Sequence, residues 1–451
     1  MSLITSDKKR IVIGVGQTGL SVARFLHARG LPFIACDTRL TGSAIDAFLK
    51  EFPTVECLRG ELDAERLASV DEMIISPGVA KDHPAIQFAV DQGVKLIGDI
   101  DLFAREVSVP IIAISGSNGK STVTTLVGKM AADAGVQVKV GGNIGTPVLD
   151  LLQAPPADLY VLELSSFQLE TTHDLRATAA TVLNMSADHM DRYTGMQAYH
   201  SAKHRIYRHC KQAIFNREDP LSRPLVPNST RQISFGLNAP DLQQFGRLFQ
   251  TGDVWLAKGA SALMAVSEMK MRGAHNELNA LAALALGEAV ALPMESMLRT
   301  LNQFPGLKHR CEWVAQRDGV DFFNDSKGTN VGATLAAVEG LGQTLQSGHK
   351  LILIAGGQAK GQAFLPLKVP AETYVKTLIV IGEDASTLAE QINHSNTVHA
   401  PSLIDAVQKA YDEAEAGDVV LLSPACASFD MFTSFEDRGD QFTSAVQGLA
   451  P

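Results

Sequence analysis

The sequence predicts an α/β fold with three domains, each built on a mostly parallel sheet. Short apolar runs rich in β-branched residues alternate with helical patterns along most of the chain, as they do in folds with parallel strands. The chain has 451 residues. At about 150 residues per domain, this length suggests about three domains. We place the boundaries near residues 100 and 305, which gives domains of residues 1–99, 100–305 and 306–451.

The first domain begins with a glycine-rich turn between an expected strand and an expected helix. The pattern G-x-G-x-x-G falls at Gly14, Gly16 and Gly19, and Asp37 follows the next expected strand. Glycines at this spacing let the backbone approach a diphosphate, so the pattern predicts a Rossmann-like nucleotide-binding domain. The pattern alone does not select among nucleotide diphosphates. The loop at residues 76–79 also follows an expected strand, and we expect it to face the same site.

The central domain opens on the segment I-I-A-I-S-G-S-N-G-K-S-T-V-T-T, residues 111–125. Its apolar start predicts a buried strand, its small residues a tight loop, and the part from Lys120 a helix. Backbone N–H groups and the helix N-terminus of such a unit face a phosphate, Lys120 adds an ammonium group, and Ser121 or Thr122 offers a hydroxyl to Mg²⁺. We therefore predict a P-loop-type, mononucleotide-binding ATPase domain. Ile114 stands where the standard P-loop has a glycine, which makes this a shorter variant.

Polar residues follow the later strands of the central domain, where ligand-binding loops are expected. Glu163 ends an apolar strand and is placed to hold Mg²⁺, directly or through water. Asn143 lies in the glycine turn G-G-N-I-G, and His189 lies in a polar loop after the next strand. For His189, a hydrogen-bonded structural role is the alternative to metal binding. Lys203 belongs to an expected helix, residues 196–207, and its own surroundings favour a solvated lysine.

The remaining segments continue the alternation of strands and helices. Residues 275–292 are predicted to form a buried helix that is apolar nearly all round, with Asn276 and Asn279 on one face near its start. The third domain has strand patterns separated by helices, so it is predicted to be Rossmann-like as well. Residues 99–110 are interpreted as a connector between the first two domains.

Charge, cysteine content and hydropathy argue against several classes of protein. The formal net charge of -10 speaks against nucleic-acid and anionic-membrane partners, which are bound through basic patches. The five cysteines are scattered without a C-x-x-C pair, which favours reduced thiols over a disulfide framework or a zinc site. No run of 18 apolar residues occurs, so we expect a soluble, cytoplasmic protein without membrane insertion.

Several motifs together resemble the Mur ligase family, over nearly the whole chain. The ATP loop of that family, shared with folylpolyglutamate synthases, resembles G-S-N-G-K-S-T. More specific, and similar in order and spacing to the D-glutamate-adding member, are E-L-S-S-F-Q-L-E, D-H-M-D-R-Y, H-N-x-x-N-A-L-A-A, H-R-C-E, N-D-S-K-x-T-N and L-S-P-A-C-A-S-F-D-M-F. The resemblance implies an enzyme of peptidoglycan precursor synthesis that uses ATP and two Mg²⁺ ions. It would join D-glutamate to UDP-N-acetylmuramoyl-L-alanine through an acyl phosphate, and the glycine-rich turn of the first domain would then bind UDP.

The resemblance also implies roles for individual residues. The catalytic group would consist of Lys120, Glu163, His189 and Lys203. The Mg²⁺ ligands would be Ser121, Glu163, His189 and Lys203. The ATP site would comprise Gly116, Ser117, Asn118, Gly119, Lys120, Ser121, Thr122, Asn276, Asn279, Arg310 and Asp325. The UDP-substrate site would comprise Gly16, Gln17, Thr18, Gly19, Asp37, Thr38, Arg39, Ser76, Pro77, Gly78, Asn143 and Ser165. The D-glutamate pocket would comprise Lys327, Thr329, Lys360, Ser428, Phe429 and Phe435.

Three positions carry further expectations from the resemblance. Lys203 matches the lysine that the family carbamylates, which would turn its cation into a carboxylate-like Mg²⁺ ligand. Ala363 stands where related sequences usually have Asp, and Phe429 stands where Leu is usual. Either departure is expected to alter the affinity for D-glutamate without changing the reaction. We expect the enzyme to be a monomer.

Four alternatives remain open on the sequence. Another amino-acid ligase, either a neighbouring Mur enzyme or a folylpolyglutamate synthase, shares the ATP loop, although D-N-P-R, the pocket motif of the diaminopimelate-adding member, is missing. An NAD-dependent oxidoreductase would account for the G-x-G-x-x-G pattern and Asp37. A catalytically inactive nucleotide-binding scaffold would account for both glycine-rich loops. The fourth alternative concerns the second of these loops, which could be a structural glycine-rich turn with an incidental lysine and no nucleotide site.

Overall fold

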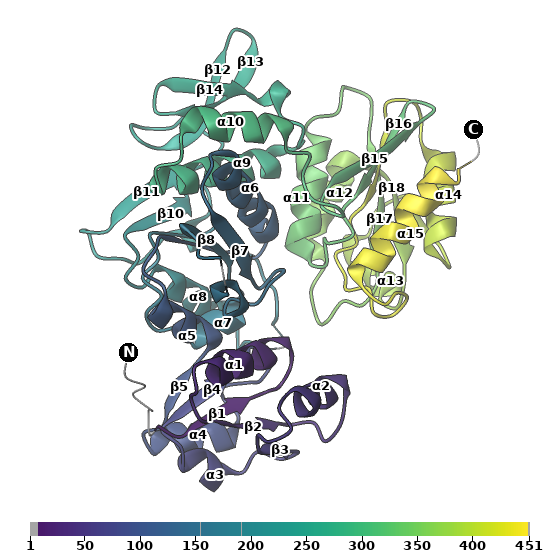
Figure 1. Cartoon of the computed structure of the whole chain (residues 1–451). Coiled ribbons are helices and arrows are strands. Elements are labelled where there is room, and N and C mark those ends of the chain that lie inside the picture. Colours follow the sequence, from purple (N-terminus) through teal and green to yellow (C-terminus); the bar gives the residue numbers. More distant parts are fainter. Residues whose placement is uncertain (1–7, 154, 191, 450–451) are drawn as a thin grey trace.

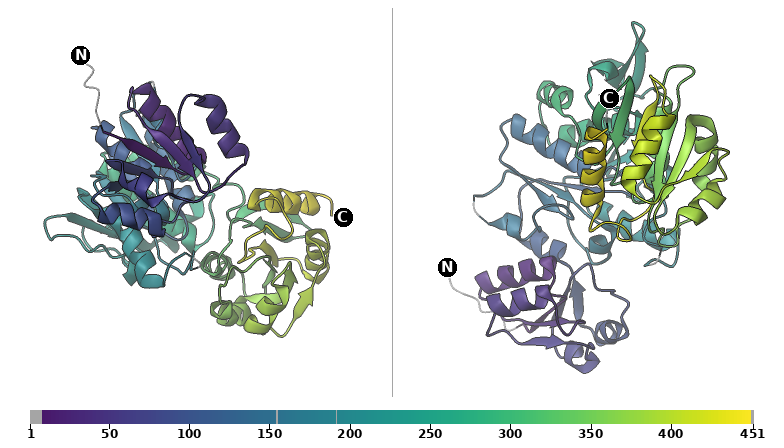
Figure 2. Two further views of the ribbon diagram at one scale, coloured as in Figure 1. Left: turned by 90° about the horizontal axis from the view of Figure 1, so that it is seen from below. Right: turned by 90° about the vertical axis from the view of Figure 1, so that its right-hand side faces the viewer.

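The computed structural model describes residues 8–153, 155–190 and 192–449, and it contains three sheets (Figure 1). The sheets have five, nine and six strands in the described residues and follow one another along the chain. Figures 1 and 2 show the first and third sheets on different sides of the central one, each with its own helices. The predicted fold class, three α/β domains with mostly parallel strands, is confirmed. The boundaries that we propose near residues 100 and 305 fall between the sheets.

The first sheet has the order β3-β2-β1-β4-β5, and all its pairs are parallel. Its strands are β1 (Arg10–Ile13), β2 (Ile34–Asp37), β3 (Cys57–Arg59), β4 (Glu72–Ile75) and β5 (Lys95–Ile97). Its helices are α1 (Gln17–Ala28), α2 (Ser43–Glu51), α3 (Ala64–Ala68) and α4 (Pro84–Asp91). Helices α1 and α2 share one apolar cluster, and α3 and α4 share another, so both faces of the sheet are covered, as in a doubly wound fold.

The central sheet has the order β14-β13-β12-β11-β10-β9-β6-β8-β7, antiparallel only from β12 to β14. Its strands are β6 (Ile111–Ser115), β7 (Val138–Gly142), β8 (Leu159–Glu163), β9 (Ala179–Val182), β10 (Gln212–Asn216), β11 (Arg231–Phe235), β12 (Phe245–Gln250), β13 (Asp253–Lys258) and β14 (Ser261–Ala265). Its helices are α5 (Asp99–Glu106), α6 (Lys120–Asp133), α7 (Ser166–Glu170), α8 (Met196–His204), α9 (Ala274–Ala289) and α10 (Met294–Gln303). Strand β6 lies between β8 and β9, which brings the loops after these three strands to one edge.

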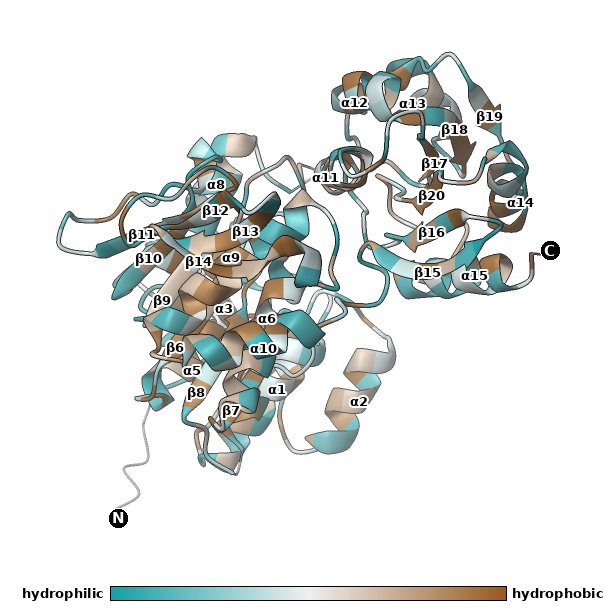
Figure 3. Ribbon diagram, turned by 90° about the horizontal axis from the view of Figure 1, so that it is seen from above, coloured by the Kyte–Doolittle hydropathy of each residue, from teal (hydrophilic) through white to brown (hydrophobic). Residues whose placement is uncertain are grey.

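The third sheet has the order β15-β16-β20-β17-β18-β19, and only its edge strand β15 is antiparallel. Its strands are β15 (Glu312–Arg317), β16 (Val320–Asn324), β17 (Leu351–Gly356), β18 (Val375–Ile381), β19 (Thr397–His399) and β20 (Val419–Leu422). Its helices are α11 (Val331–Gly342), α12 (Lys368–Tyr374), α13 (Ala385–Ile392), α14 (Leu403–Glu413) and α15 (Phe435–Gln447). Figure 3 shows the apolar strands β17, β18 and β20 inside this domain, with helices around them. Continuous apolar strands of this kind are typical of sheets that are buried on both faces.

Helix α5 corrects one expectation from the sequence. Residues 99–110 do connect the first sheet to the second, but they are more than a plain connector, because Asp99–Glu106 forms a helix whose Ile100 and Phe103 are fully buried. Its charged residues obscured the apolar face, and Asp99 and Asp101 in its first turn favour a helix start. The predicted burial of helix α9 is confirmed. In the described part of the chain, no helix is long and apolar enough to cross a membrane.

Candidate active site

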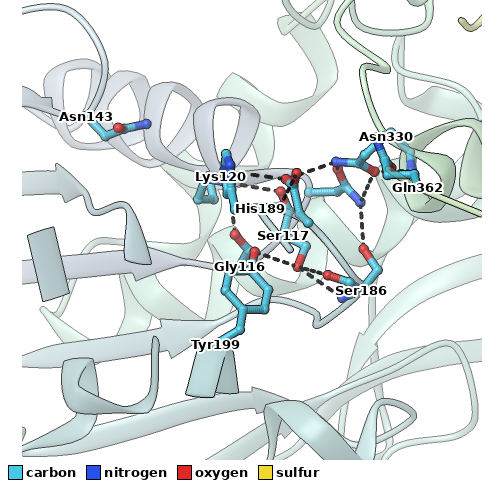
Figure 4. A network of polar contacts seen from close by, with 12 residues as sticks. Gly116, Ser117, Lys120, Asn143, Ser186, His189, Tyr199, Asn330 and Gln362 are labelled. Carbon is cyan, nitrogen blue, oxygen red and sulfur yellow. Dashed lines mark hydrogen bonds and ion pairs between the residues drawn. The ribbon is translucent and has the colours of Figure 1, made fainter. Parts of the chain in front are cut away.

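The loop between β6 and α6 has the geometry of a phosphate-binding loop. The predicted strand, loop and helix are confirmed as Ile111–Ser115, the loop, and Lys120–Asp133. Gly116 and Gly119 have φ angles of 147° and 82°, a region that glycine occupies without strain. Lys120 Nζ donates hydrogen bonds to the carbonyl oxygens of Gly116 at 2.8 Å and Ser117 at 2.9 Å (Figure 4). The ammonium group is therefore held at the start of the helix, where an anion would also meet the helix dipole.

A cavity of about 290 Å³ lies beside this loop, between the central and C-terminal domains. Inside it, Asn279 Nδ2 donates to Asn276 Oδ1 at 3.2 Å, so the two asparagines share one face of α9 as predicted. Asp325 receives a hydrogen bond from Ser423 Oγ at 2.7 Å, and burial raises the pKa of its carboxyl group to about 7. The predicted residues that line this cavity are Asn118, Gly119, Thr122, Asn276, Asn279, Arg310, Asp325 and Lys327.

A larger cavity, of about 670 Å³, lies on the other side of the loop. It brings together residues that the sequence places in separate loops of two domains. The predicted residues that line it are Ser117, Asn118, Gly119, Lys120, Ser121, Asn143, Glu163, Ser165, His189, Lys203, Arg310, Lys327, Thr329, Lys360, Ser428, Phe429 and Phe435. All four expected catalytic residues are among them. Because Asn118, Gly119, Arg310 and Lys327 line both cavities, the two form one extended site.

Glu163 presents a buried carboxylate to the larger cavity. Its Oε1 accepts a hydrogen bond from Asn143 Nδ2 at 2.8 Å, whereas its buried Oε2 has no hydrogen-bond partner in the described part of the chain. A buried carboxylate oxygen without a partner is costly, and a bound cation would relieve that cost. The described residues contain no group of three His, Cys, Asp or Glu side chains that could hold a metal by themselves. A metal at Glu163 would therefore need further ligands from hydroxyl groups, water, phosphate or a modified side chain.

Lys203 is buried, so its local interpretation as a solvated lysine is wrong. Its side chain comes from helix α8, is 2% exposed, and lies with Nζ 4.8 Å from the ring centre of Tyr199. Its Nζ donates a hydrogen bond of 2.8 Å to the Gly116 carbonyl oxygen. Burial, and then the charge of Lys120, hold the pKa of Lys203 well below its usual value. A lowered pKa makes the neutral, nucleophilic form of this amine more accessible than that of a solvated lysine.

His189 stands on a tight turn of the loop after β9. Its φ angle of 57° is unusual for a residue with a side chain, and its backbone N–H donates to Asp188 Oδ1 at 3.0 Å. The imidazole ring lies 4.9 Å from the ring centre of Phe167, and it faces the cavity that holds Lys120 (Figure 4). The turn thus directs the imidazole toward the same space as Glu163 and Lys203.

The C-terminal domain contacts the phosphate-binding loop directly. Arg310 Nη2 donates to Ser121 Oγ at 2.7 Å, and Asn330 Nδ2 donates to Asn118 Oδ1 at 3.3 Å. Asn330 also donates to Asp188 Oδ2 at 3.2 Å and caps helix α11 (Figure 4). Asn330 therefore connects the phosphate-binding loop and the loop of Asp188 to the start of helix α11.

Two lysines of the C-terminal domain lie over aromatic rings at the far wall of the larger cavity. Lys327 Nζ is 3.7 Å from the ring centre of Phe435, and Lys360 Nζ is 5.3 Å from that of Phe429. Burial, and then the charge of Arg310, lower the pKa of Lys327 to about 8. Two cations in a partly buried wall favour an anionic ligand.

The predicted residues of the N-terminal domain form a separate group, outside both cavities. Ser76 Oγ donates to the Gly14 carbonyl oxygen at 2.7 Å, which joins the loops after β1 and β4. Asp37 accepts from the Val15 N–H at 2.9 Å and from the Arg39 guanidinium at 2.8 Å. The Arg39 guanidinium holds the pKa of Asp37 at about 2. Strands β1, β2 and β4 end at one edge of the sheet, so these loops share an edge, as predicted.

Three models of one protein family match the chain in order along its length. The Mur ligase MurD-like N-terminal domain matches residues 8–98, the Mur ligase middle domain residues 114–287, and the Mur ligase glutamate ligase domain residues 309–426. The chain belongs to the Mur ligase family. This membership confirms the resemblance seen in the motifs and decides against the oxidoreductase alternative.

Two relatives that match this Mur ligase over its full length have the same functional name. UDP-N-acetylmuramoylalanine--D-glutamate ligase of Pseudomonas fluorescens (strain Pf0-1) is 54% identical over 451 residues, which is 100% of both chains. The protein of the same name from Pseudomonas aeruginosa is 52% identical, again over 100% of both chains. Among solved structures, MurF ligase from Thermotoga maritima in complex with ADP has a TM-score of 0.62 at 15% identity, covering 99% of this chain and 97% of that chain. At this identity the structural likeness shows the fold alone.

Several residues of this Mur ligase site were not singled out from the sequence. The hydroxyl oxygen of Tyr199 lies 3.1 Å from Ser117 Oγ, and this tyrosine is 1% exposed. Gln168 forms a capping box with Ser165, and Asn330 joins two domains. Gln168 and Asn330 lie within motifs that the sequence had marked as a whole. No local pattern marks Tyr199, apart from its position one helical turn before Lys203.

Proposed function

We propose that the protein is an ATP-dependent amide ligase that adds D-glutamate to UDP-N-acetylmuramoyl-L-alanine in peptidoglycan synthesis. The observation that carries this proposal is the 54% identity, over the full length of both chains, with a UDP-N-acetylmuramoylalanine--D-glutamate ligase. Membership of the Mur ligase family implies ATP use. ATP use in turn supports the expected cytoplasmic location. We propose that the enzyme acts as a monomer.

ATP would lie along the phosphate-binding loop, from the smaller cavity into the larger one. Asn276 and Asn279 would contact adenine, and Asp325 would contact the ribose. Lys120 and Arg310 would neutralise the phosphates, which they can reach because both side chains line the larger cavity. Asn118 and Gly119 line both cavities, which supports adenine in the smaller cavity and the phosphates in the larger one.

The residues around Glu163 fit Mg²⁺, which would supply charge neutralisation to the phosphates and to the substrate carboxylate. The unpartnered Oε2 of Glu163 and the hydroxyl group of Ser121 would hold one ion. His189 and a carbamylated Lys203 would hold a second. Burial holds the pKa of the Lys203 amine well below its usual value, which favours addition of CO₂, and the resulting carbamate would supply a further carboxylate ligand.

The chemistry proceeds in two steps. The L-alanine carboxylate attacks the γ-phosphorus of ATP, and ADP leaves. The amine of D-glutamate then attacks the acyl phosphate, loses a proton and expels inorganic phosphate. The residues position the reactants and neutralise charge, and no side chain needs to form a covalent bond with either substrate.

D-Glutamate would bind at the aromatic wall of the C-terminal domain. Its two carboxylates match the cations of Lys327 and Lys360, and Thr329 and Ser428 add hydroxyl groups. Phe429 and Phe435 would complete the pocket. These residues face Lys203 across one cavity, which supports a path from the amine of D-glutamate to the acyl phosphate.

The UDP group of the other substrate would bind at the N-terminal domain. Gly16 to Gly19, Asp37 to Arg39 and Ser76 to Gly78 lie at the strand ends where doubly wound folds bind nucleotides. The sugar and L-alanine would extend to Asn143 and Ser165 in the larger cavity. Because Arg39 pairs with Asp37 in the structure, we assign Arg39 to the rim of the uracil site.

A panel of amino acids tests the proposal directly. The purified protein is incubated with UDP-N-acetylmuramoyl-L-alanine, Mg-ATP and one amino acid at a time, and ADP release and the coupled product are measured. D-Glutamate should be strongly preferred. Preference for another amino acid would replace this function with that of a neighbouring ligase. Failure to release ADP with any acceptor would support the inactive scaffold.

A further inference from the structure

Arg192 joins the loop of His189 to the N-terminal domain. Its Nη1 donates to the Pro77 carbonyl oxygen at 3.3 Å, and its Nη2 donates to the Val79 carbonyl oxygen at 3.1 Å. Both acceptors lie in the loop after β4, which carries the proposed contacts to the UDP group. The planar guanidinium thus holds two carbonyl groups, two residues apart in one loop of another domain, with donors in a fixed fork.

The same side chain is fixed on the side of the central domain. Its Cζ lies 4.5 Å from the ring centre of Phe167, a cation–π distance, and Nη2 lies 3.9 Å from Glu170 Oε2. Phe167 also packs against the His189 ring, and the Arg192 N–H donates to the His189 carbonyl oxygen at 2.9 Å. Arg192 and His189 are therefore two ends of one turn, and Phe167 contacts both side chains.

We propose that Arg192 is a positioning residue that couples the loop of Ser76–Val79 in the N-terminal domain to the turn that presents His189. Filling of the nucleotide-sugar site orders the Ser76–Val79 loop, and the two carbonyl groups hold the guanidinium in place. The fixed guanidinium in turn holds the His189 turn in the orientation that faces the γ-phosphate. Each substrate then binds to a site that the other has already ordered, and the binding of the two is cooperative.

The physical requirement for Arg192 is the pair of carbonyl groups, not an opposite charge. Among the described residues its nearest carboxylate, that of Glu170, is at 3.9 Å, whereas both carbonyl oxygens are within hydrogen-bond distance. Substitution by Met keeps the apolar contact with Phe167 and removes both hydrogen bonds. Substitution by Lys keeps the charge but replaces the planar two-nitrogen fork by a compact ammonium group, so we expect it to retain the contacts to the two carbonyl oxygens only in part.

Arg105 offers a matched control between the same two domains. It extends from α5 and donates to Glu72 Oε1 at 2.7 Å. Glu72 begins β4, whereas the loop held by Arg192 follows the end of that strand, so the two arginines contact opposite edges of the sheet. Arg105→Met therefore removes an interdomain contact without touching either substrate loop.

Calorimetric titration tests the coupling between nucleotide-sugar binding and ATP binding. This inference rests on the proposed function. The dissociation constant of UDP-N-acetylmuramoyl-L-alanine is measured with and without a non-hydrolysable ATP analogue and Mg²⁺, in the native protein and in Arg192→Met, Arg192→Lys and Arg105→Met. We expect the analogue to tighten binding about tenfold in the native protein and in Arg105→Met. In Arg192→Met the ratio should approach one, with an intermediate ratio in Arg192→Lys.

The outcomes separate this inference from the function on which it rests. If the native protein does not bind the nucleotide sugar, the proposed function fails. If binding is coupled and the ratio in both Arg192 variants equals the native ratio, the function stands and the coupling role is wrong. A native ratio of one also overturns the coupling. Circular dichroism and Tm show that each variant is folded before it is titrated, and Arg192→Lys serves if Arg192→Met does not fold.

Discussion

Lys203 Nζ and the Gly116 carbonyl oxygen are joined by a hydrogen bond of 2.8 Å, and Lys120 Nζ donates to the same oxygen at the same distance. Two lysine amines from different helices thus meet at one peptide group of the phosphate-binding loop. Burial lowers the pKa of both amines, and a neighbouring positive charge adds to this, that of Arg310 at Lys120 and that of Lys120 at Lys203. In the proposed mechanism Lys203 is the amine that is modified, while Lys120 remains at the phosphate site.

Lys203→Ala tests the role of the modified amine. We expect kcat to fall about 100-fold or more, because one carboxylate ligand of Mg²⁺ would be lost. Short carboxylic acids, which can fill the space left by the side chain, should partly restore activity to this variant and not to the native protein. The measurement is initial rate against acid concentration. Full activity in Lys203→Ala would remove the carbamate from the mechanism.

Glu163→Gln tests the unpartnered oxygen at the proposed Mg²⁺ site. The substitution removes the charge but retains the size, so kcat should fall about 100-fold and half-maximal rate should require more Mg²⁺. The matched control is Glu72→Gln, another buried carboxylate, which pairs with Arg105. The control should lower Tm and leave the Mg²⁺ dependence unchanged. An unchanged Mg²⁺ dependence in Glu163→Gln would contradict the assignment.

Gly119→Ala tests the close approach of the phosphate-binding loop to helix α9. A Cβ at Gly119 would lie 2.4 Å from Asn279 Oδ1, in a backbone with φ of 82°. We expect KM for ATP to rise at least about tenfold, since the loop and the adenine-side asparagine must both shift. Gly135→Ala, at the other end of α6, has φ of 83° and open space around its Cβ. It should show similar backbone strain, seen as a lower Tm, with an unchanged KM for ATP.

Asp99→Asn tests a buried carboxyl group at the start of α5. Burial raises the pKa of Asp99 from 3.8 to about 6, so the folded state binds its proton more tightly than the unfolded state does. The stability from that proton is fully present below about pH 4 and is lost as the pH rises through 6, a loss of about 3 kcal/mol. The Tm of Asp99→Asn minus the native Tm should therefore increase between pH 4 and pH 7. Parallel Tm curves would show that Asp99 does not titrate in this range.

Phe429→Leu tests one of the two departures from the family's pattern. The ring is 65% exposed and lies 5.3 Å from Lys360 Nζ. A cation–π contact at an exposed site contributes about 0.5–1 kcal/mol, so KM for D-glutamate should rise about two- to fivefold with kcat unchanged. Phe249→Leu, at an exposed position of β12, is the control and should change neither constant. A large loss of kcat would instead make Phe429 part of the reacting geometry.

Much of the fold was predictable because its signals are local. The alternation of apolar strands and helices identified three α/β domains, and the glycine-rich segment after Ile114 identified the phosphate-binding loop. Helix α5 was missed because its charged residues obscured a short apolar face. The polar loops were found because they follow strands, and two loops of the N-terminal domain were expected at one edge. Strand patterns could not say which side chains of the central and C-terminal domains meet.

The sequence by itself determined the fold class, the family motifs and the chemical types available for catalysis. Only the tertiary structure decided that Lys203 is buried against the Gly116 carbonyl group, that Glu163 keeps one oxygen without a partner, and that Arg192 reaches the N-terminal domain. The physical reason is the range of the interactions. Hydrophobic periodicity and turn chemistry act between near neighbours in sequence, whereas desolvation and interdomain hydrogen bonds depend on residues that come together only when the chain folds.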